Sequence, residues 1–251
     1  RGVTDRYLAQ FSANRGLLLN ATYLGTAAYD QSFFVEIDDD GDVYVTGQSL
    51  GSYPVTAGVY NNPGGKQFIH KLNNTFSATL YATVFGSGSS TTNISPTAFL
   101  VDVCENVYVS GWGGDVNQFA PNPFTQGYTT GMALSSDALQ ATSDGSDFYY
   151  IVLNKNAQSL LYATYFGGNG VHEHVDGGTS RFDRNGIVYQ AMCAGCGGSD
   201  FTPTTPGVWS NTNNSFNCNL LGMKLAFDLS GTYVEIDAYP RATGCVPLNV
   251  Q

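Results

Sequence analysis

Residues that could do chemistry crowd into the stretch EHVDGGTSRFDRNGIVYQAMCAGCGG, which runs from Glu173 to Gly198. If the beginning of this stretch is extended, His172, His174 and Asp176 project to one face, at a spacing that could hold a metal ion. The sequence fixes no further ligand, and a hydrogen-bonded structural cluster accounts for the same residues. Both interpretations stay open at this point.

Two cysteines of this stretch, Cys193 and Cys196, form a CxxC motif, which can indicate zinc binding or redox chemistry. Zinc usually requires a second such pair, but Cys218 and Cys245 stand alone. A thioredoxin-like site requires a helix that begins at the motif, and CAGCGGSD is too rich in glycine to start one. We therefore expect at least one disulfide among Cys193, Cys196 and Cys218, with its pairing undecided. Together with Cys104, five cysteines are typical of an oxidising compartment and favour a secreted, cell-surface protein.

A run of acidic residues, EIDDDGD from Glu36 to Asp42, partly resembles a calcium loop. Its Asp38, Asp40 and Asp42 could supply carboxylate ligands. A calcium loop of the helix–loop–helix type has a glutamate near its twelfth position, where this chain has Gly47. A hairpin turn explains the same aspartates without a metal. The sequence thus predicts no cofactor, with calcium at these residues as the alternative.

Motifs of common catalytic sites are missing from the sequence, which has no GxSxG, no HExxH and no GxGxxG between a strand and a helix. Ser180 follows GGT, but a hydrolase would need a histidine placed to deprotonate this serine. The histidines are His70, His172 and His174, and His70 stands in the strand-like segment FIHKL. We therefore predict no enzymatic activity.

Two tryptophans could face a ligand, because an exposed indole ring can stack on a sugar. They are Trp112 in SGWGG and Trp209 in GVWSN. Packing between neighbouring sheets is the other explanation for both side chains.

Composition limits both the fold and the partners. Only 12% of the residues are charged, whereas the chain has 30 Gly, 16 Tyr and 15 Phe, a mixture that favours strands joined by tight turns. The net charge of −10 argues against nucleic acid as a partner. The longest apolar runs, such as YYIVL, are far shorter than the roughly 18 residues of a membrane-spanning helix. The chain starts at Arg1 without a charged-then-apolar leader, so we expect a mature chain or a fragment.

One sequence frame recurs three times, and its fixed part is the distance of six residues from an aspartate to a tyrosine. The pairs are Asp38–Tyr44, Asp102–Tyr108 and Asp183–Tyr189. Each pair lies between an upstream segment of the LYATYFG type and a Pro/Thr-rich connector that leads to a further strand-like segment. Alternation in DVYVTG and NVYVSG predicts strands, and Asp, Asn and Gly between them predict turns. Each copy therefore supplies about four short strands, and repeated units of this kind stack around an axis as the blades of a β-propeller.

We expect an all-β fold of about three and a half such blades, whereas a closed ring usually has roughly four to eight. The expected boundaries are residues 1–25 for the last two strands of a preceding blade, and 26–83, 84–164 and 165–239 for three further blades. Either the chain is part of a larger propeller, which we favour, or one missing half-blade closes an unusually small ring.

The recurring frame, with LYATYFG, FDRNGIVYQAM and FTPTTPGVW in the third copy, resembles the bacterial SBBP-type β-propeller repeat over nearly the whole chain. The third copy is also similar to propellers in large surface proteins of gliding bacteria, which are associated with gliding motility and exported by the type IX secretion system. Residues 240–251, which include ATGCVPLNVQ, resemble the opening strand of a PKD or immunoglobulin-like domain. The second copy departs from the pattern, since it has CENVY in place of the usual Gly-Asn turn and a longer connector.

The resemblance implies a non-catalytic propeller module of a secreted cell-surface protein that acts in adhesion or as a scaffold for gliding-related surface structures. Its partners would be a protein or a glycan at the cell surface, and the secretion machinery during export. The alternative is a glycan-binding accessory module of a secreted polysaccharide-acting protein, which would use Trp112 or Trp209. A metal-dependent hydrolase that works through His172, His174 and Asp176 is the third candidate, and the fold alone does not decide among them.

Overall fold

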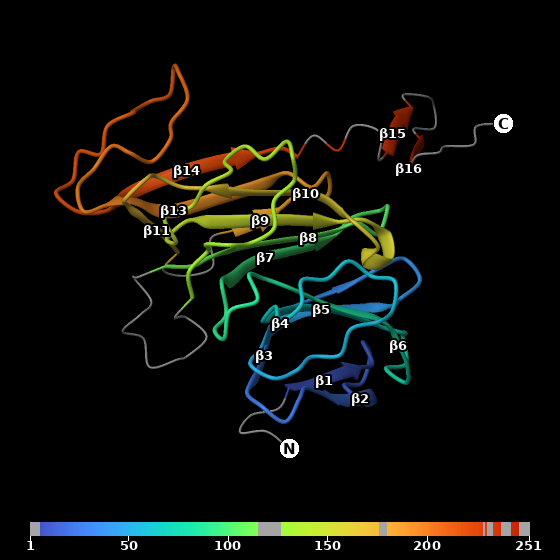
Figure 1. The fold of residues 1–251 in the computed structure, drawn as a ribbon. Coiled ribbons are helices and arrows are strands. Elements are labelled where there is room, and N and C mark those ends of the chain that lie inside the picture. Colours follow the sequence, from blue (N-terminus) through green and yellow to red (C-terminus); the bar gives the residue numbers. More distant parts are fainter. Residues whose placement is uncertain are drawn as a thin grey trace.

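The computed structural model describes residues 6–114, 127–175, 180–227, 229, 233–236 and 242–245, the last two ranges by their backbone alone. Within these ranges the chain forms β-strands and one short 3-10 turn, η3 (Lys155–Ala157), and no α-helix (Figure 1). The prediction of an all-β fold is therefore confirmed.

Two four-stranded antiparallel sheets have their strands in chain order. The first sheet comprises β3 (Asp30–Ile37), β4 (Val43–Ser49), β5 (Gln67–Leu72) and β6 (Thr79–Phe85). The second sheet comprises β7 (Ser95–Val101), β8 (Val107–Trp112), β9 (Phe148–Leu153) and β10 (Leu160–Phe166). Each strand thus pairs with the strand that follows it in the chain.

The third sheet is built around β13 (Val188–Cys196). One edge of β13 pairs with β14 (Asn219–Leu225), and the other edge pairs first with β12 (Ser180–Phe182) and then with β11 (His172–His174). Two further pairs of strands form small sheets, namely β1 (Arg6–Phe11) with β2 (Leu18–Leu24), and β15 (Tyr233–Ile236) with β16 (Ala242–Cys245). The four successive strands expected in each sequence copy are therefore observed in the first two sheets. The third sheet also has four strands, but it is three strands across, because β11 and β12 pair with the same edge of β13.

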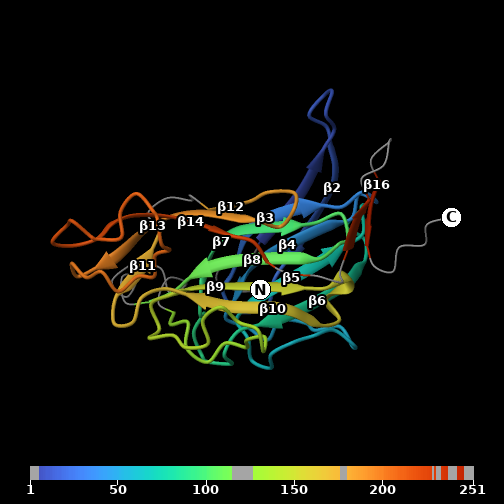
Figure 2. The same cartoon turned by 90° about the horizontal axis from the view of Figure 1, so that it is seen from above.

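The sheets pack face to face in the order of the chain, from the β1–β2 hairpin to the third sheet (Figures 1 and 2). Because the second sheet lies between the first and the third, all six residues of β9 are buried, and alternate ones face different cores. Those facing the first sheet are Tyr149, Ile151 and Leu153, and those facing the third sheet are Phe148, Tyr150 and Val152. A strand between two cores must be apolar on both faces, which explains the continuous apolar run FYYIVL.

Each of the three sheets has the same aspartate-centred turn. One carboxylate oxygen of the aspartate accepts backbone N–H bonds from the residues two and four positions later, at distances from 2.8 to 3.1 Å. The aspartates are Asp38, Asp102 and Asp183. These bonds satisfy backbone donors that no strand partner reaches at the chain reversal. The predicted turn function of the recurring aspartates is thereby confirmed.

In two of the three copies the constant spacing from aspartate to tyrosine brings the two side chains into contact, whereas in the first copy the Tyr44 hydroxyl donates to Glu105 at 3.3 Å. In the second sheet the Tyr108 hydroxyl donates to Oδ2 of Asp102 at 2.9 Å, and in the third sheet the Tyr189 hydroxyl lies 3.4 Å from Oδ2 of Asp183. Tyr108 is almost fully buried, so the bond satisfies a phenol that cannot reach bulk water.

Glu105 stands in the second sheet where the other two turns have a glycine, and it joins this sheet to the first. Its φ of 58° lies in the left-handed region, as do those of Gly41 and Gly186. For a residue with a side chain this conformation costs about 1–2 kcal/mol. The carboxylate offsets that cost, because its oxygens lie 3.1 Å from Nζ of Lys71 in β5 and 2.5 Å from Nζ of Lys155. The unusual sequence CENVY thus preserves the turn and adds an ionic contact between sheets.

Replacing Asp102 by alanine should destabilise the fold by about 2 kcal/mol or more, because two backbone N–H groups and the side chains of Asn106 and Tyr108 would lose their acceptor. Urea unfolding followed by circular dichroism measures this change. Asp39→Ala removes an exposed carboxylate from the corresponding turn of the first sheet, and we expect it to leave the midpoint unchanged. An Asp102→Ala midpoint equal to the wild-type value would contradict the proposed role of the turn.

The ionic contact at Glu105 predicts a dependence of stability on pH. Burial raises the pKa of Glu105, but the ammonium groups of Lys155 and Lys71 outweigh burial and hold this pKa below its ordinary value. Such a carboxylate stabilises the fold above its ordinary pKa and loses this effect as the pH falls through the lowered value. We therefore expect the wild type to lose stability from about pH 5 to about pH 3. Glu105→Gln should start about 1 kcal/mol less stable at neutral pH, because solvent screens this ion pair in part, and lose less over that window, so parallel curves for the two proteins would contradict this assignment.

Candidate functional site

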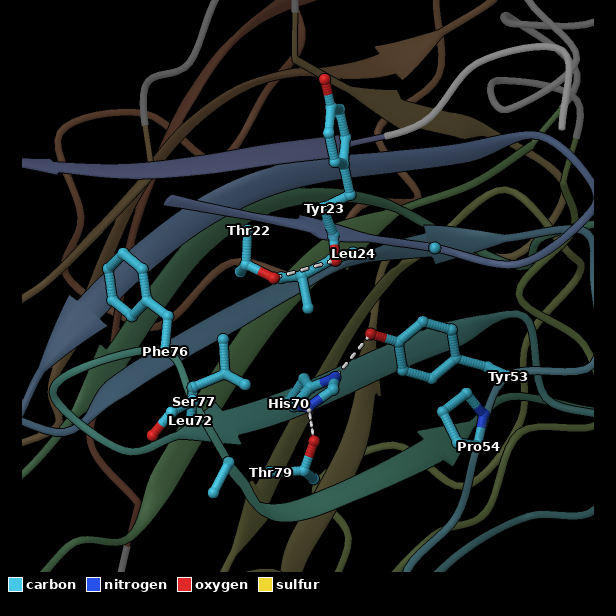
Figure 3. Close-up of a pocket in the computed structure, with 12 residues that line it drawn as sticks. Thr22, Tyr23, Leu24, Tyr53, Pro54, His70, Leu72, Phe76, Ser77 and Thr79 are labelled. Carbon is cyan, nitrogen blue, oxygen red and sulfur yellow. Dashed lines mark hydrogen bonds between the residues drawn. The ribbon is translucent and has the colours of Figure 1, made fainter. Parts of the chain in front are cut away.

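A hollow of about 280 Å³ lies between the β1–β2 hairpin and the first sheet (Figure 3). Thr22 and Leu24 line it from β2, Tyr53 from the connector after β4, and His70 and Thr79 from β5 and β6. His70 is the one histidine in this lining, which contains no carboxylate and no lysine or arginine. Any chemistry in the hollow would therefore depend on His70.

His70 is engaged at both ring nitrogens. The Tyr53 hydroxyl lies 2.8 Å from Nδ1, and the Thr79 hydroxyl lies 2.8 Å from Nε2 (Figure 3). Burial, with a smaller contribution from the charge of Arg6, lowers the pKa of His70 to about 4. Burial raises the pKa of Tyr53 to about 12. At neutral pH the ring is thus uncharged and the phenol keeps its proton.

These contacts occupy the polar groups of the cluster. Each hydroxyl can donate or accept, so the two hydrogen bonds fit either neutral tautomer of the ring. In either tautomer both ring nitrogens are bonded within the cluster. We interpret the three side chains as a structural hydrogen-bonded cluster.

The histidines considered as metal ligands, His172 and His174, lie on β11, and the strand register shifts between them. Asp176 lies outside the described residues. The group that comes together among the described residues is instead His174, Cys196 and Cys218, whose potential ligand atoms all lie within 4.8 Å of one another. Because the two sulfurs form a disulfide, they are not available as the thiolates that a metal would bind.

The acidic run of the first sheet directs carboxylates to a lysine. Lys71 Nζ lies 2.8 Å from Oδ2 of Asp38 and 3.5 Å from Oδ2 of Asp42. Asp40 is exposed, and its backbone N–H donates to Asp38. The ammonium group supplies a positive charge to these carboxylates, so the turn interpretation accounts for the aspartates without calcium.

Cys196 and Cys218 form a disulfide, which confirms the expectation of a bond among the three candidate cysteines and decides its pairing. Cys193 is therefore not bonded to the other cysteine of the CxxC motif. Cys104 also takes part in a disulfide. The Cys196–Cys218 bond closes the connector between β13 and β14, residues 197–217, which we call the disulfide-closed loop.

The disulfide-closed loop carries large aromatic side chains in solvent. Trp209 is 100% exposed, Phe216 is 97% exposed and Phe201 is 69% exposed. The loop projects beyond the ends of β13 and β14, where it is drawn in orange (Figure 1). Exposed aromatic residues grouped in this way are typical of a contact surface.

Internal hydrogen bonds hold the disulfide-closed loop in shape. The Asn213 side-chain amide donates to the carbonyl oxygens of Gly195 and Asn217, both at 2.9 Å. The backbone N–H of Asn213 donates to the Asp200 carboxylate. A loop that is already ordered loses little conformational entropy when it binds a partner.

Trp112, the other tryptophan considered as ligand-facing, is buried and cannot meet a ligand in this structure. It is 6% exposed, and its ring lies 5.7 Å from the ring of His174 in the core between the second and third sheets. The packing alternative therefore holds for Trp112, whereas Trp209 is accessible. The exposure of Phe216 could not be predicted from the sequence, because an aromatic residue within a run of Asn, Ser and Thr has no periodic pattern that indicates whether it is buried.

Replacing both loop cysteines, Cys196→Ser with Cys218→Ser, should lower the stability by about 3 kcal/mol and open the loop to proteases. Limited proteolysis with mass spectrometry locates the first cut, which we expect within residues 197–217. Cys193→Ser leaves the disulfide intact and should not expose this loop. Equal cleavage of the loop in the double variant and the wild type would contradict a stabilising role of the disulfide.

In the part of the chain that the structure describes, no helix has the length and apolar character needed to cross a membrane. Comparison with models of protein families found no match, and no curated protein is significantly similar to the chain. The function is therefore inferred from the chain's own sheets, disulfide-closed loop and buried polar groups.

Proposed function

We propose that the chain is part of a β-propeller in a secreted cell-surface protein, where it acts in adhesion or as a scaffold for surface structures and has no catalytic role. The observation that carries this proposal is the way in which neighbouring sheets meet. The most extensive contacts between strands of different sheets join β3 to β7 and β7 to β12, which all belong to the beginnings of their sheets. Four-stranded sheets that meet along their first strands are arranged like propeller blades. The blades would correspond to the expected ranges 26–83, 84–164 and 165–239, with the boundaries moved to the ends of β6 at Phe85 and β10 at Phe166.

Two observations support secretion. Cys104, Cys196 and Cys218 are oxidised to disulfides, which persist in oxidising compartments outside the cytosol. The repeats also resemble those of gliding-motility surface proteins, which suits export by the type IX secretion system.

The use of the recurring polar residues supports a non-catalytic role. The aspartates of the three copies accept backbone hydrogen bonds in turns. His70 is uncharged and engaged at both nitrogens. Turnover of a substrate that is lost in His70→Ala would contradict this part of the proposal.

The disulfide-closed loop is the surface that we assign to adhesion. Trp209 and Phe216 offer large apolar areas that become buried when a protein partner docks, and aromatic residues of this kind often contribute most of the binding free energy. The disulfide and Asn213 hold the loop before binding, so that little of this free energy is lost to ordering.

A competition assay tests this assignment. The purified chain, added in excess, should reduce the attachment of cells that display the protein, and Trp209→Ala with Phe216→Ala should weaken this competition by about tenfold or more. Tyr23→Ala, which removes a 74% exposed aromatic ring from β2 on a different sheet, is the matched control and should compete as the wild type does. Equal competition by the wild type and the loop variant, or no competition by either, would contradict the assignment.

A glycan-binding accessory module of a secreted polysaccharide-acting protein is the second candidate, because the fully exposed Trp209 ring stands among Asn, Ser and Thr residues. A glycan array distinguishes the two. Saturable glycan binding that is lost in Trp209→Ala and kept in Phe216→Ala would favour this candidate. An array without signal, together with competition in the cell assay, would favour adhesion to a protein.

A further inference from the structure

A polar side chain caps the same backbone group at three successive places in the chain. At each place a glycine ends a strand, and the residue after it donates its N–H to a side-chain oxygen at the start of the following sheet. At the first place Thr26, which follows Gly25, donates to Asp30 at 2.5 Å. At the second, Ser87 follows Gly86 and donates to Asn93 at 2.8 Å. At the third, Gly168 follows Gly167 and donates to Glu173 at 3.1 Å. The three places can therefore be compared directly.

At the first two places the buried cap leaves no unbalanced charge. Arg6, at the start of β1, lies 3.3 Å from Oδ1 of Asp30, and the two side chains are 5% and 0% exposed. At the second place a Cβ added to Gly86 would lie 2.9 Å from the terminal amide groups of both Asn93 and Gln67. The first place thus holds an ion pair, and the second holds two neutral amides.

The third place holds two carboxylates instead. Asp147 directly precedes β9, and Glu173 lies in β11. Both converge on Gly167, since a Cβ there would collide with Oδ1 of Asp147 and Oε2 of Glu173. The two residues are 0% and 1% exposed. No ion pair among the described residues includes either one, and the undescribed stretches 115–126 and 176–179 contain no lysine or arginine.

Three oxygens of this carboxylate pair are buried and have no hydrogen-bond donor among the described residues. Within the described ranges of the chain, no donor bonds to either oxygen of Asp147 or to Oε2 of Glu173. The remaining oxygen, Oε1 of Glu173, accepts bonds from Gly168 N at 3.1 Å and from the Thr202 hydroxyl at 2.6 Å. These two bonds fix the orientation of the carboxylate and leave Oε2 directed toward Asp147.

The pair cannot remain doubly ionised without a counter-charge. Burial raises the pKa of Glu173 to about 8 and the pKa of Asp147 to about 6, and the charge of Asp144 adds to both shifts. The side chains of Ser143 and Gln140 lower the pKa of Asp147 in part, but neither makes a hydrogen bond of ordinary geometry to its carboxylate. Adjacent buried carboxylates must therefore take up either a proton or a cation.

We propose that Asp147 and Glu173 bind a calcium ion at Gly167. Two carboxylates match the charge of a divalent cation, and their oxygens are the hard ligands that Ca²⁺ prefers. The three oxygens without a donor would form the charged part of a shell that backbone carbonyls complete. Mg²⁺ fits less well, because it keeps several bound waters and these carboxylates are fully buried.

The ion would join two sheets, as Arg6 and Asp30 do at the first place. Asp147 belongs to the second sheet and Glu173 to the third. Asp144 braces the connectors on either side of the site, since its carboxylate accepts N–H bonds from Ser146 at 2.9 Å and Gly170 at 2.6 Å. Calcium at this seam therefore does what the Arg6 guanidinium does between the β1–β2 hairpin and the first sheet.

Calorimetric titration of the full chain with Ca²⁺, after removal of metal by a chelator, tests the proposal. We expect one saturable site and a melting temperature that rises with the Ca²⁺ concentration. Asp147→Asn and Glu173→Gln keep the shape of the side chains, remove one charge each and should weaken Ca²⁺ binding by about tenfold or more. Asp39→Asn removes the same charge from an exposed position and should leave the affinity unchanged.

A wild-type chain that gives no saturable Ca²⁺ signal and melts identically with chelator and with Ca²⁺ would overturn the proposal, because the pair would then hold a proton only. Equal weakening by Asp39→Asn and Glu173→Gln would also overturn it, since the binding would then reflect diffuse negative charge. The titration of the wild type decides the matter even if a variant fails to fold. None of these outcomes depends on the adhesive role of the disulfide-closed loop.

Discussion

The burial of the second sheet on both faces is the constraint on which most of this structure depends. Every residue of β9 is buried, and its backbone groups are satisfied by β8 on one side and β10 on the other. A sheet enclosed in this way has no polar face. Its strands still bury single hydroxyl groups, such as those of Ser110 and Thr164. The paired charged side chains lie at strand ends, in turns and along the seams between sheets, where they join one part of the chain to another.

The charged side chains that meet between neighbouring sheets differ from one pair of sheets to the next. Lys71 meets Glu105 between the first and second sheets, and Arg6 meets Asp30 beside the β1–β2 hairpin. The acids among the described residues that are almost fully buried are Asp30, Asp147 and Glu173. Asp30 has Arg6 as its partner, whereas no ion pair of the described residues reaches the two carboxylates that meet at Gly167. The proposed calcium ion would supply the missing positive charge there.

Structural features whose physical cause lies within a few neighbouring residues could be predicted from the sequence. The turn at Asp38 follows from residues within four positions of one another, so the recurring frame was sufficient to predict it. Tertiary causes leave no such pattern. Asp147 and Glu173 belong to different sheets and meet only because those sheets pack, and Trp112 differs from Trp209 in exposure because only the first lies between two sheets.

Central to this account is the claim that the stacked sheets are blades of one propeller in a secreted cell-surface protein. An experimental structure of the intact protein, recovered from the cell surface or the culture medium, tests that claim most directly. The account predicts that the sheets are arranged around one axis with β3, β7 and the β11–β12 edge nearest to it, and with the β1–β2 hairpin in a neighbouring blade. Sheets stacked in parallel without a common axis would contradict it.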